Sequence, residues 1–135
     1  MAVLSEGICA NGASISFGDY TVKQKLKIDN FEFNGDIYKL KTHNQVTRLE
    51  KNDGLFMETV PGAAIHDLVF SPSEIAFYAE GIGDTQVTLS LEPSEKYSLK
   101  IDDSIMGEMN TGSSGKFIFS ALLSGEKKKI IIDKH

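Results

Sequence analysis

The fold class is decided by residues 25–42, which read KLKIDNFEFNGDIYKLKT. Apolar and charged residues alternate on both sides of Asn34 and Gly35, and such alternation is typical of strands with one buried face. An Asn-Gly pair also tolerates the positive φ angles of a two-residue hairpin turn. The stretch therefore predicts an antiparallel β-hairpin.

A second hairpin and a series of short strands are expected further along the chain. Asn52-Asp53-Gly54 separates alternating runs at 46–50 and 55–60, and Pro61-Gly62 closes the pair. Further apolar runs, each bounded by turn residues, lie at 65–70, 75–79, 86–91, 97–101, 105–109, 117–121 and 128–132. No window carries a 3.6-residue apolar stripe, so we expect little or no helix. Turn signals about every 8–12 residues predict one antiparallel β-sandwich, immunoglobulin-like or jelly-roll, over residues 1–135.

Charge excludes some partners. The chain has 14 basic and 19 acidic residues, a formal net charge of −5, which disfavours nucleic acid and anionic membranes as partners. Residues 42–110 hold 4 basic and 12 acidic groups, whereas 111–135 hold 5 and 2. This scatter fits ordinary solvated faces, or oppositely charged patches that match between subunits. Lys127-Lys128-Lys129 precedes an isoleucine run and is interpreted as a guard against edge-to-edge aggregation.

Residues that commonly bind metals or act in catalysis are few in this sequence. Cys9 is the single cysteine, so no intramolecular disulfide is expected. The 3 histidines form no H-x-H pair, and there is no C-x-x-C or G-x-S-x-G motif, so we expect no metal, no cofactor and no catalytic residue. His66 and Asp67 are adjacent, but neighbours in a strand point to opposite faces, which argues against a catalytic pair.

Sugar binding on a β-sandwich relies on exposed aromatic rings. The chain has no Trp, which is the strongest stacking residue. Tyr38 and Tyr78 are the candidate stacking residues, and Arg48 is the candidate for an acidic ligand group.

Several segments together carry a resemblance to a known family. They are SFGDY at 16–20, FEFNGDIYKLKT at 31–42, TRLE at 47–50, ETVPG at 58–62, LSLEP at 89–93 and GKFIFS at 115–120. The chain resembles a family of short bacterial proteins, some of which carry the label endosialidase. Its C-terminal half also resembles immunoglobulin-like accessory modules of polysaccharide-active enzymes. Sialidases hold the substrate carboxylate with an arginine cluster, and Arg48 is the single arginine here, so we do not expect hydrolysis.

These observations predict a non-catalytic protein that acts by self-assembly or by association with another protein. An N-terminal arm, residues 1–10, is expected to add a strand to a neighbouring subunit through Val3, Leu4 and Ile8. The alternatives are a glycan-binding accessory module and a small glycan hydrolase that uses acids such as Glu58 and Asp67. No signal peptide or membrane span is recognised, so a cytoplasmic location is the default, and secretion is expected if a signal sequence was removed.

Overall fold

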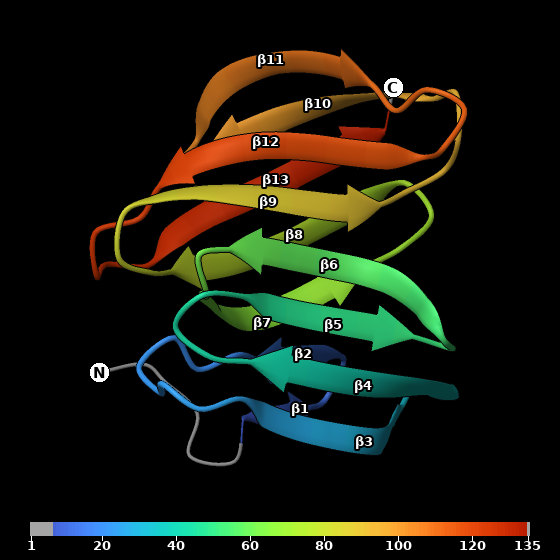
Figure 1. Ribbon diagram of the computed structural model, residues 1–135. Helices are drawn as coiled ribbons and strands as arrows, with labels where there is room; N and C mark the ends of the chain where they lie inside the picture. The colour runs from blue at the N-terminus through green and yellow to red at the C-terminus, as the bar shows by residue number, and fades with distance from the viewer. Residues whose placement is uncertain (1–6, 135) are drawn as a thin grey trace.

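Every regular element in residues 7–134, the part of the chain that the computed structural model describes, is a β-strand (Figure 1). The strands are β1 (Ile8–Asn11), β2 (Ser14–Phe17), β3 (Leu26–Phe33), β4 (Asp36–Thr42), β5 (Thr47–Lys51), β6 (Gly54–Val60), β7 (Ala64–Phe70), β8 (Glu74–Glu80), β9 (Asp84–Ser90), β10 (Lys96–Ile101), β11 (Ser104–Asn110), β12 (Lys116–Leu122) and β13 (Lys128–Lys134). Within the same residues, no helix is long and apolar enough to cross a membrane.

The strands form two antiparallel sheets that pack face to face. Sheet A has the order β1-β2-β7-β8-β13-β10-β11, and sheet B has the order β12-β9-β6-β5-β4-β3. In Figure 1 sheet B lies in front of sheet A. The predicted all-β sandwich without helix is therefore confirmed.

Both predicted hairpins are present. Asn34 and Gly35 have φ angles of 51° and 83° in the turn that joins β3 to β4. Asn52 and Asp53, with φ of 51° and 69°, form the corresponding turn between β5 and β6. Two successive positive φ angles give a turn whose twist matches that of the flanking strands, which explains why these short polar residues occupy it.

The core lies between the sheets and is built from alternate residues of the strands. In β12, for example, Phe117, Phe119 and Ala121 are buried. The largest fully buried side chains are Tyr38, Phe17, Phe77, Phe117, Ile15, Leu49, Met57, Ile65, Leu68, Leu89, Leu123 and Ile130. Each such apolar side chain contributes about 1.5–3 kcal/mol by leaving water.

The N-terminal segment differs from the predicted arm. Ile8 is buried and pairs with Phe17 of the same chain, because β1 and β2 form a hairpin at one edge of sheet A. Ile8 thus belongs to this chain's own sheet A and not to a free arm, and its addition to a neighbouring subunit stays a prediction. Val3 and Leu4 lie outside the described residues.

The basic C-terminal segment also differs from its interpretation. β13 lies between β8 and β10, so its lysines do not guard an edge strand. Lys128 Nζ lies 3.7 Å from Asp102 Oδ2, and Lys129 Nζ lies 3.9 Å from Asp103 Oδ1. Residues of the acidic and basic segments thus pair within one chain. The charges of Asp102, Asp103, Lys128 and Lys129 are therefore already paired and do not need a partner on a second subunit.

Candidate functional site

The two sides of the sandwich end in very different edge strands. β1 and β3 are the edges on one side, and β11 and β12 are the edges on the other, at the top of Figure 1. An edge strand carries unpaired backbone N–H and C=O groups that can pair with another chain. The side chains along each edge therefore decide whether it is protected from such pairing.

The β1 and β3 edge is protected. β1 has only 4 residues. In β3 the pairing with β4 is interrupted by a bulge between Ile28 and Phe31, and Asn30 there has a φ of 58°. β3 also carries Lys27 and Glu32. Short length, a bulge and charge are the devices by which natural edge strands avoid pairing with other chains.

The β11 and β12 edge is open by comparison. β11 has 7 residues with neither Lys nor Pro, and Ile105 and Met106 are 75% and 58% exposed. β12 presents Ile118 and Leu122, which are 49% and 62% exposed. In β11 a bulge leaves Met106 without a partner on β10, and such bulges redirect a side chain. Apolar side chains are thus exposed along both edges of this side.

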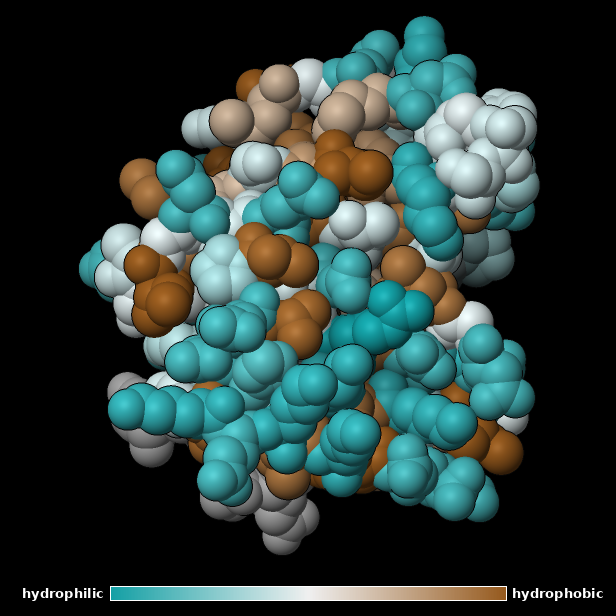
Figure 2. Space-filling model, viewed as in Figure 1, coloured by the Kyte–Doolittle hydropathy of each residue, from teal (hydrophilic) through white to brown (hydrophobic). Residues whose placement is uncertain are grey.

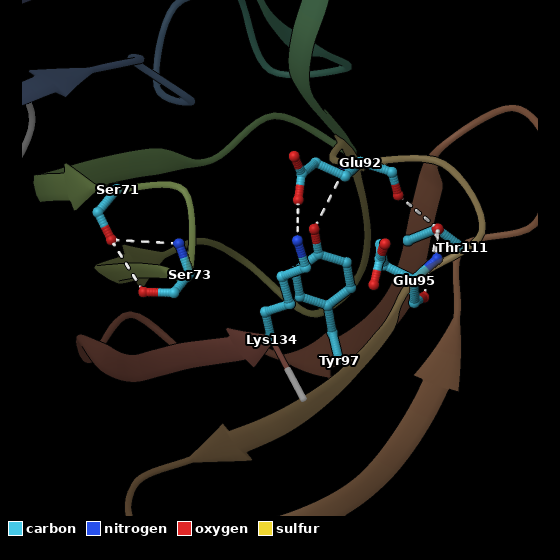
Figure 3. A network of polar contacts seen from close by, with 7 residues as sticks. All are labelled: Ser71, Ser73, Glu92, Glu95, Tyr97, Thr111 and Lys134. Atoms are coloured by element: carbon cyan, nitrogen blue, oxygen red, sulfur yellow. Dashed lines mark hydrogen bonds and ion pairs between the residues drawn. The ribbon is translucent and has the colours of Figure 1, made fainter.

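A partly buried polar network fixes the end of β11 (Figure 3). Thr111 Oγ1 donates a 2.6 Å hydrogen bond to the Glu92 carbonyl and accepts one of 3.1 Å from the Glu95 N–H. The Glu92 N–H donates to Tyr97 Oη at 3.2 Å, and the Glu92 carboxylate pairs with Lys134 of β13. The turn between β9 and β10 therefore ties β11 to the middle of sheet A, so the edge is held in place before any partner arrives.

A cleft of about 570 Å³ opens between the two sheets near the same turn. Most of its wall is apolar, and it is lined by the aromatic side chains Phe56, Phe70 and Tyr97. The ring centroids of Phe56 and Phe70 are 5.1 Å apart. A concave apolar site of this size is a usual place for a ligand when polar groups converge in it.

The charged groups of this cleft already have partners in the protein. Lys51 Nζ lies over the Phe56 and Phe70 rings, at 5.4 and 4.8 Å from their centroids, and 4.0 Å from Asp36 Oδ2. Glu92 is paired with a lysine, and a hydrogen bond to an aspartate of β13 raises the pKa of Glu74. Lys51 and Glu92 thus have partners of opposite charge, Glu74 is bonded to another carboxyl group, and we do not base a function on the cleft.

The sequence-predicted ligand residues are not brought together. Tyr38 is 0% exposed and packs against Phe33 and Phe56, so the prediction that it forms a stacking surface is wrong. Tyr38 and the buried Leu40 share one face of β4, which explains the burial. Tyr78 is 38% exposed on sheet A, whereas Arg48 lies on sheet B.

Arg48 is held by two carboxylates on the outer face of sheet B. Its Nε donates to Glu50 Oε2 at 3.1 Å and its Nη1 donates to Glu58 Oε2 at 3.0 Å. These hydrogen bonds raise the pKa of Arg48 above its ordinary value. Glu58 lies beside Arg48 on the outer face of sheet B, and Asp67 is an exposed residue of β7 in sheet A, so the acid pair considered for a hydrolase does not share one cleft.

One polar cluster was missed in the sequence. His66 Nε2 lies 3.2 Å from Glu80 Oε1, and the Tyr20 hydroxyl donates to Glu80 Oε2 at 2.7 Å. Burial is the main cause that lowers the pKa of His66, while burial followed by the hydrogen bond to Glu80 raises that of Tyr20 to about 12. The carboxylate that contacts His66 is Glu80, 14 residues away, rather than the adjacent Asp67. A prediction that β7 pairs with β8 would have placed Glu80 near His66 and so located this cluster.

Comparison with protein-family models finds no match, and comparisons with curated proteins and with solved structures return no significant match either. The contacts and exposed surfaces of this chain are therefore the basis for assigning a function.

Proposed function

We propose that the protein is a non-catalytic association module that pairs with a second copy of itself through β11 and β12. The contrast between the two sides of the sandwich carries this proposal. Both edge strands contain a bulge and a charged residue, but the exposed side chains of β3 are all charged or polar, whereas β11 exposes Ile105 and Met106. Exposed apolar side chains on an edge strand favour pairing with another chain.

A symmetric dimer is the simplest geometry for such an edge. Two copies of β11 in antiparallel orientation would supply the missing backbone hydrogen bonds to each other across a two-fold axis. Ile105 and Met106, 75% and 58% exposed in the monomer, would lose water on contact. The Thr111 network supports this geometry because an edge that is already ordered loses less conformational entropy on binding.

Light scattering coupled to size-exclusion chromatography tests the proposal. The wild-type protein is expected to be a dimer at about 100 µM, and the double variant Ile105→Lys, Met106→Lys a monomer, because charge opposes edge pairing. Ile37→Lys is the matched control, since Ile37 is 47% exposed but lies on β4, which has neighbours on both sides. A monomeric wild-type protein, or equal dissociation in the control, would contradict the proposal.

A further inference from the structure

Three cations form one row across the outer face of sheet B. Lys27 of β3 pairs in register with Lys41 of β4, and Lys41 pairs with Arg48 of β5. Side chains directly opposite each other in an antiparallel pair have Cβ atoms about 4.5–5.5 Å apart, and like charges at this distance repel. The row is therefore an arrangement that sheet stability alone does not favour.

The bulge in β3 creates this alignment. The register beside the turn, continued without a bulge, would place Lys27 opposite Thr42 instead of Lys41. The additional residue in β3, where Asn30 has a φ of 58°, shifts the pairing by one position. The backbone irregularity thus brings the cations of β3 and β4 together.

Carboxylates of the chain do not neutralise the row fully. Lys27 and Lys41 make no ion pair with any residue among 7–134. Arg48 uses Nε and Nη1 for its two glutamates, so Nη2 has no hydrogen-bond partner within that part of the chain. One guanidinium nitrogen and two ammonium groups remain to bind a ligand.

A shallow groove of about 220 Å³ lies over these residues. Four cations line it, the row together with Lys39, against the acids Asp29 and Glu50. Arg48 is also bonded to Glu58, and Lys39 Nζ lies 3.9 Å from Asp53 Oδ1, so Lys27 and Lys41 are the cations of the groove without an ion pair among residues 7–134. Figure 2 shows hydrophilic side chains gathered over β3, β4 and β5, whereas more of the hydrophobic surface lies nearer β9 and β12. The groove thus presents two ammonium groups that are unpaired within the described residues, in a chain of net charge −5.

We propose that this groove binds a compact polyanion that carries two or more phosphate or sulfate groups. Neighbouring strands are about 4.8 Å apart, so the row presents positive charge over about 10 Å. A linked pair or triplet of oxyanions matches a row of this length better than a single oxyanion does. Arg48 is suited to bind phosphate or sulfate oxygens because its planar group is already oriented by two carboxylates.

Isothermal titration calorimetry at about 20 mM salt tests this site, with inorganic tripolyphosphate and a trisulfated heparin disaccharide as separate probes. At least one probe is expected to bind the wild type more than tenfold more tightly than orthophosphate does, and the probe that binds identifies the ligand source. The double variant Lys27→Gln, Lys41→Gln is expected to weaken that binding at least tenfold. Arg48→Lys keeps the positive charge but loses the planar guanidinium group with its paired N–H donors, and is expected to weaken binding severalfold.

Two controls separate binding from nonspecific charge and from a structural role. Lys96→Gln, Lys100→Gln makes the same change of charge on sheet A, and is expected to leave the affinity within about twofold. Without ligand, Lys41→Gln is expected to raise the Tm by about 1–3 °C, because it removes like-charge repulsion. Absence of binding by both probes at 1 mM, roughly the weakest affinity that such a site should have, would overturn the proposal. An equal loss of affinity in the sheet A variant would overturn it as well, and neither result would bear on dimerisation through β11.

Discussion

The buried hydroxyl of Tyr38 provides a sharp test of the packing. Tyr38 is 0% exposed, and among the described residues its hydroxyl has no hydrogen-bond partner. Its ring packs against Phe56 at 6.4 Å and Phe33 at 6.2 Å between centroids. Burial followed by the charge of Asp36 raises the pKa of Tyr38 to about 12, so the hydroxyl is neutral at pH 7. Tyr38→Phe removes only the oxygen and keeps both ring contacts.

The expected change is an increase in stability. A buried polar group without a partner costs about 1–3 kcal/mol, and the small void left by one oxygen returns part of this cost. We therefore expect Tyr38→Phe to raise the free energy of unfolding by about 1 kcal/mol, or the Tm by about 3–5 °C.

Tyr97→Phe is the matched control. Tyr97 is also a buried core residue, but its hydroxyl accepts the Glu92 N–H at 3.2 Å. Removing this acceptor is expected to lower the free energy of unfolding by about 0.5–1.5 kcal/mol. Urea unfolding at pH 7, with equal slopes for the three proteins, measures both changes. A loss of stability of about 1 kcal/mol in Tyr38→Phe would show that the hydroxyl has a partner and would refute the reasoning.

Three further predictions concern other buried sites. Because burial lowers the pKa of His66 below 6.5, the unfolded chain takes up a proton first, so stability is expected to fall as the pH drops below 6.5. Urea unfolding at pH 7.5 and 5.5 should show a smaller fall for His66→Gln. Gly62→Ala would place a Cβ 2.0 Å from the His43 carbonyl oxygen and should cost about 3 kcal/mol in thermal unfolding, against about 1 for Gly12→Ala, where no atom lies within 4 Å. Thr47→Val removes the hydroxyl that bonds the Ala63 carbonyl at 2.9 Å and N–H at 3.1 Å, and should cost about 2 kcal/mol in urea unfolding.

The strands and turns could be predicted because their causes are local. Asn34-Gly35 and Asn52-Asp53 carry the conformational preference of their turns in their own side chains. Neighbour relations in a sheet depend instead on segments far apart in the chain. No local sequence feature indicates that β13 lies between β8 and β10. The interpretation of the Lys127 segment as protection of an edge strand was therefore wrong.

The candidate sites were less predictable because they depend on register. The contact of His66 with Glu80 requires β7 to pair with β8, and sequence adjacency pointed instead to Asp67. Lys27 and Lys41 both lay in the predicted hairpin, but a one-residue bulge decides that they oppose each other. The burial of Tyr38 could have been predicted, because alternate residues of a strand share a face and Tyr38 lies two positions from the apolar Leu40.

The interior position of β13 has a consequence for the order of events during synthesis. Residues 128–134 follow all the other strands in the chain, yet they lie between β8 and β10 in sheet A. Until this segment leaves the ribosome, β8 and the β10–β11 hairpin have no strand between them, and sheet A remains in two parts. Nascent chains that end before residue 128 are therefore expected to be sensitive to protease, and resistance should appear only once β13 has emerged.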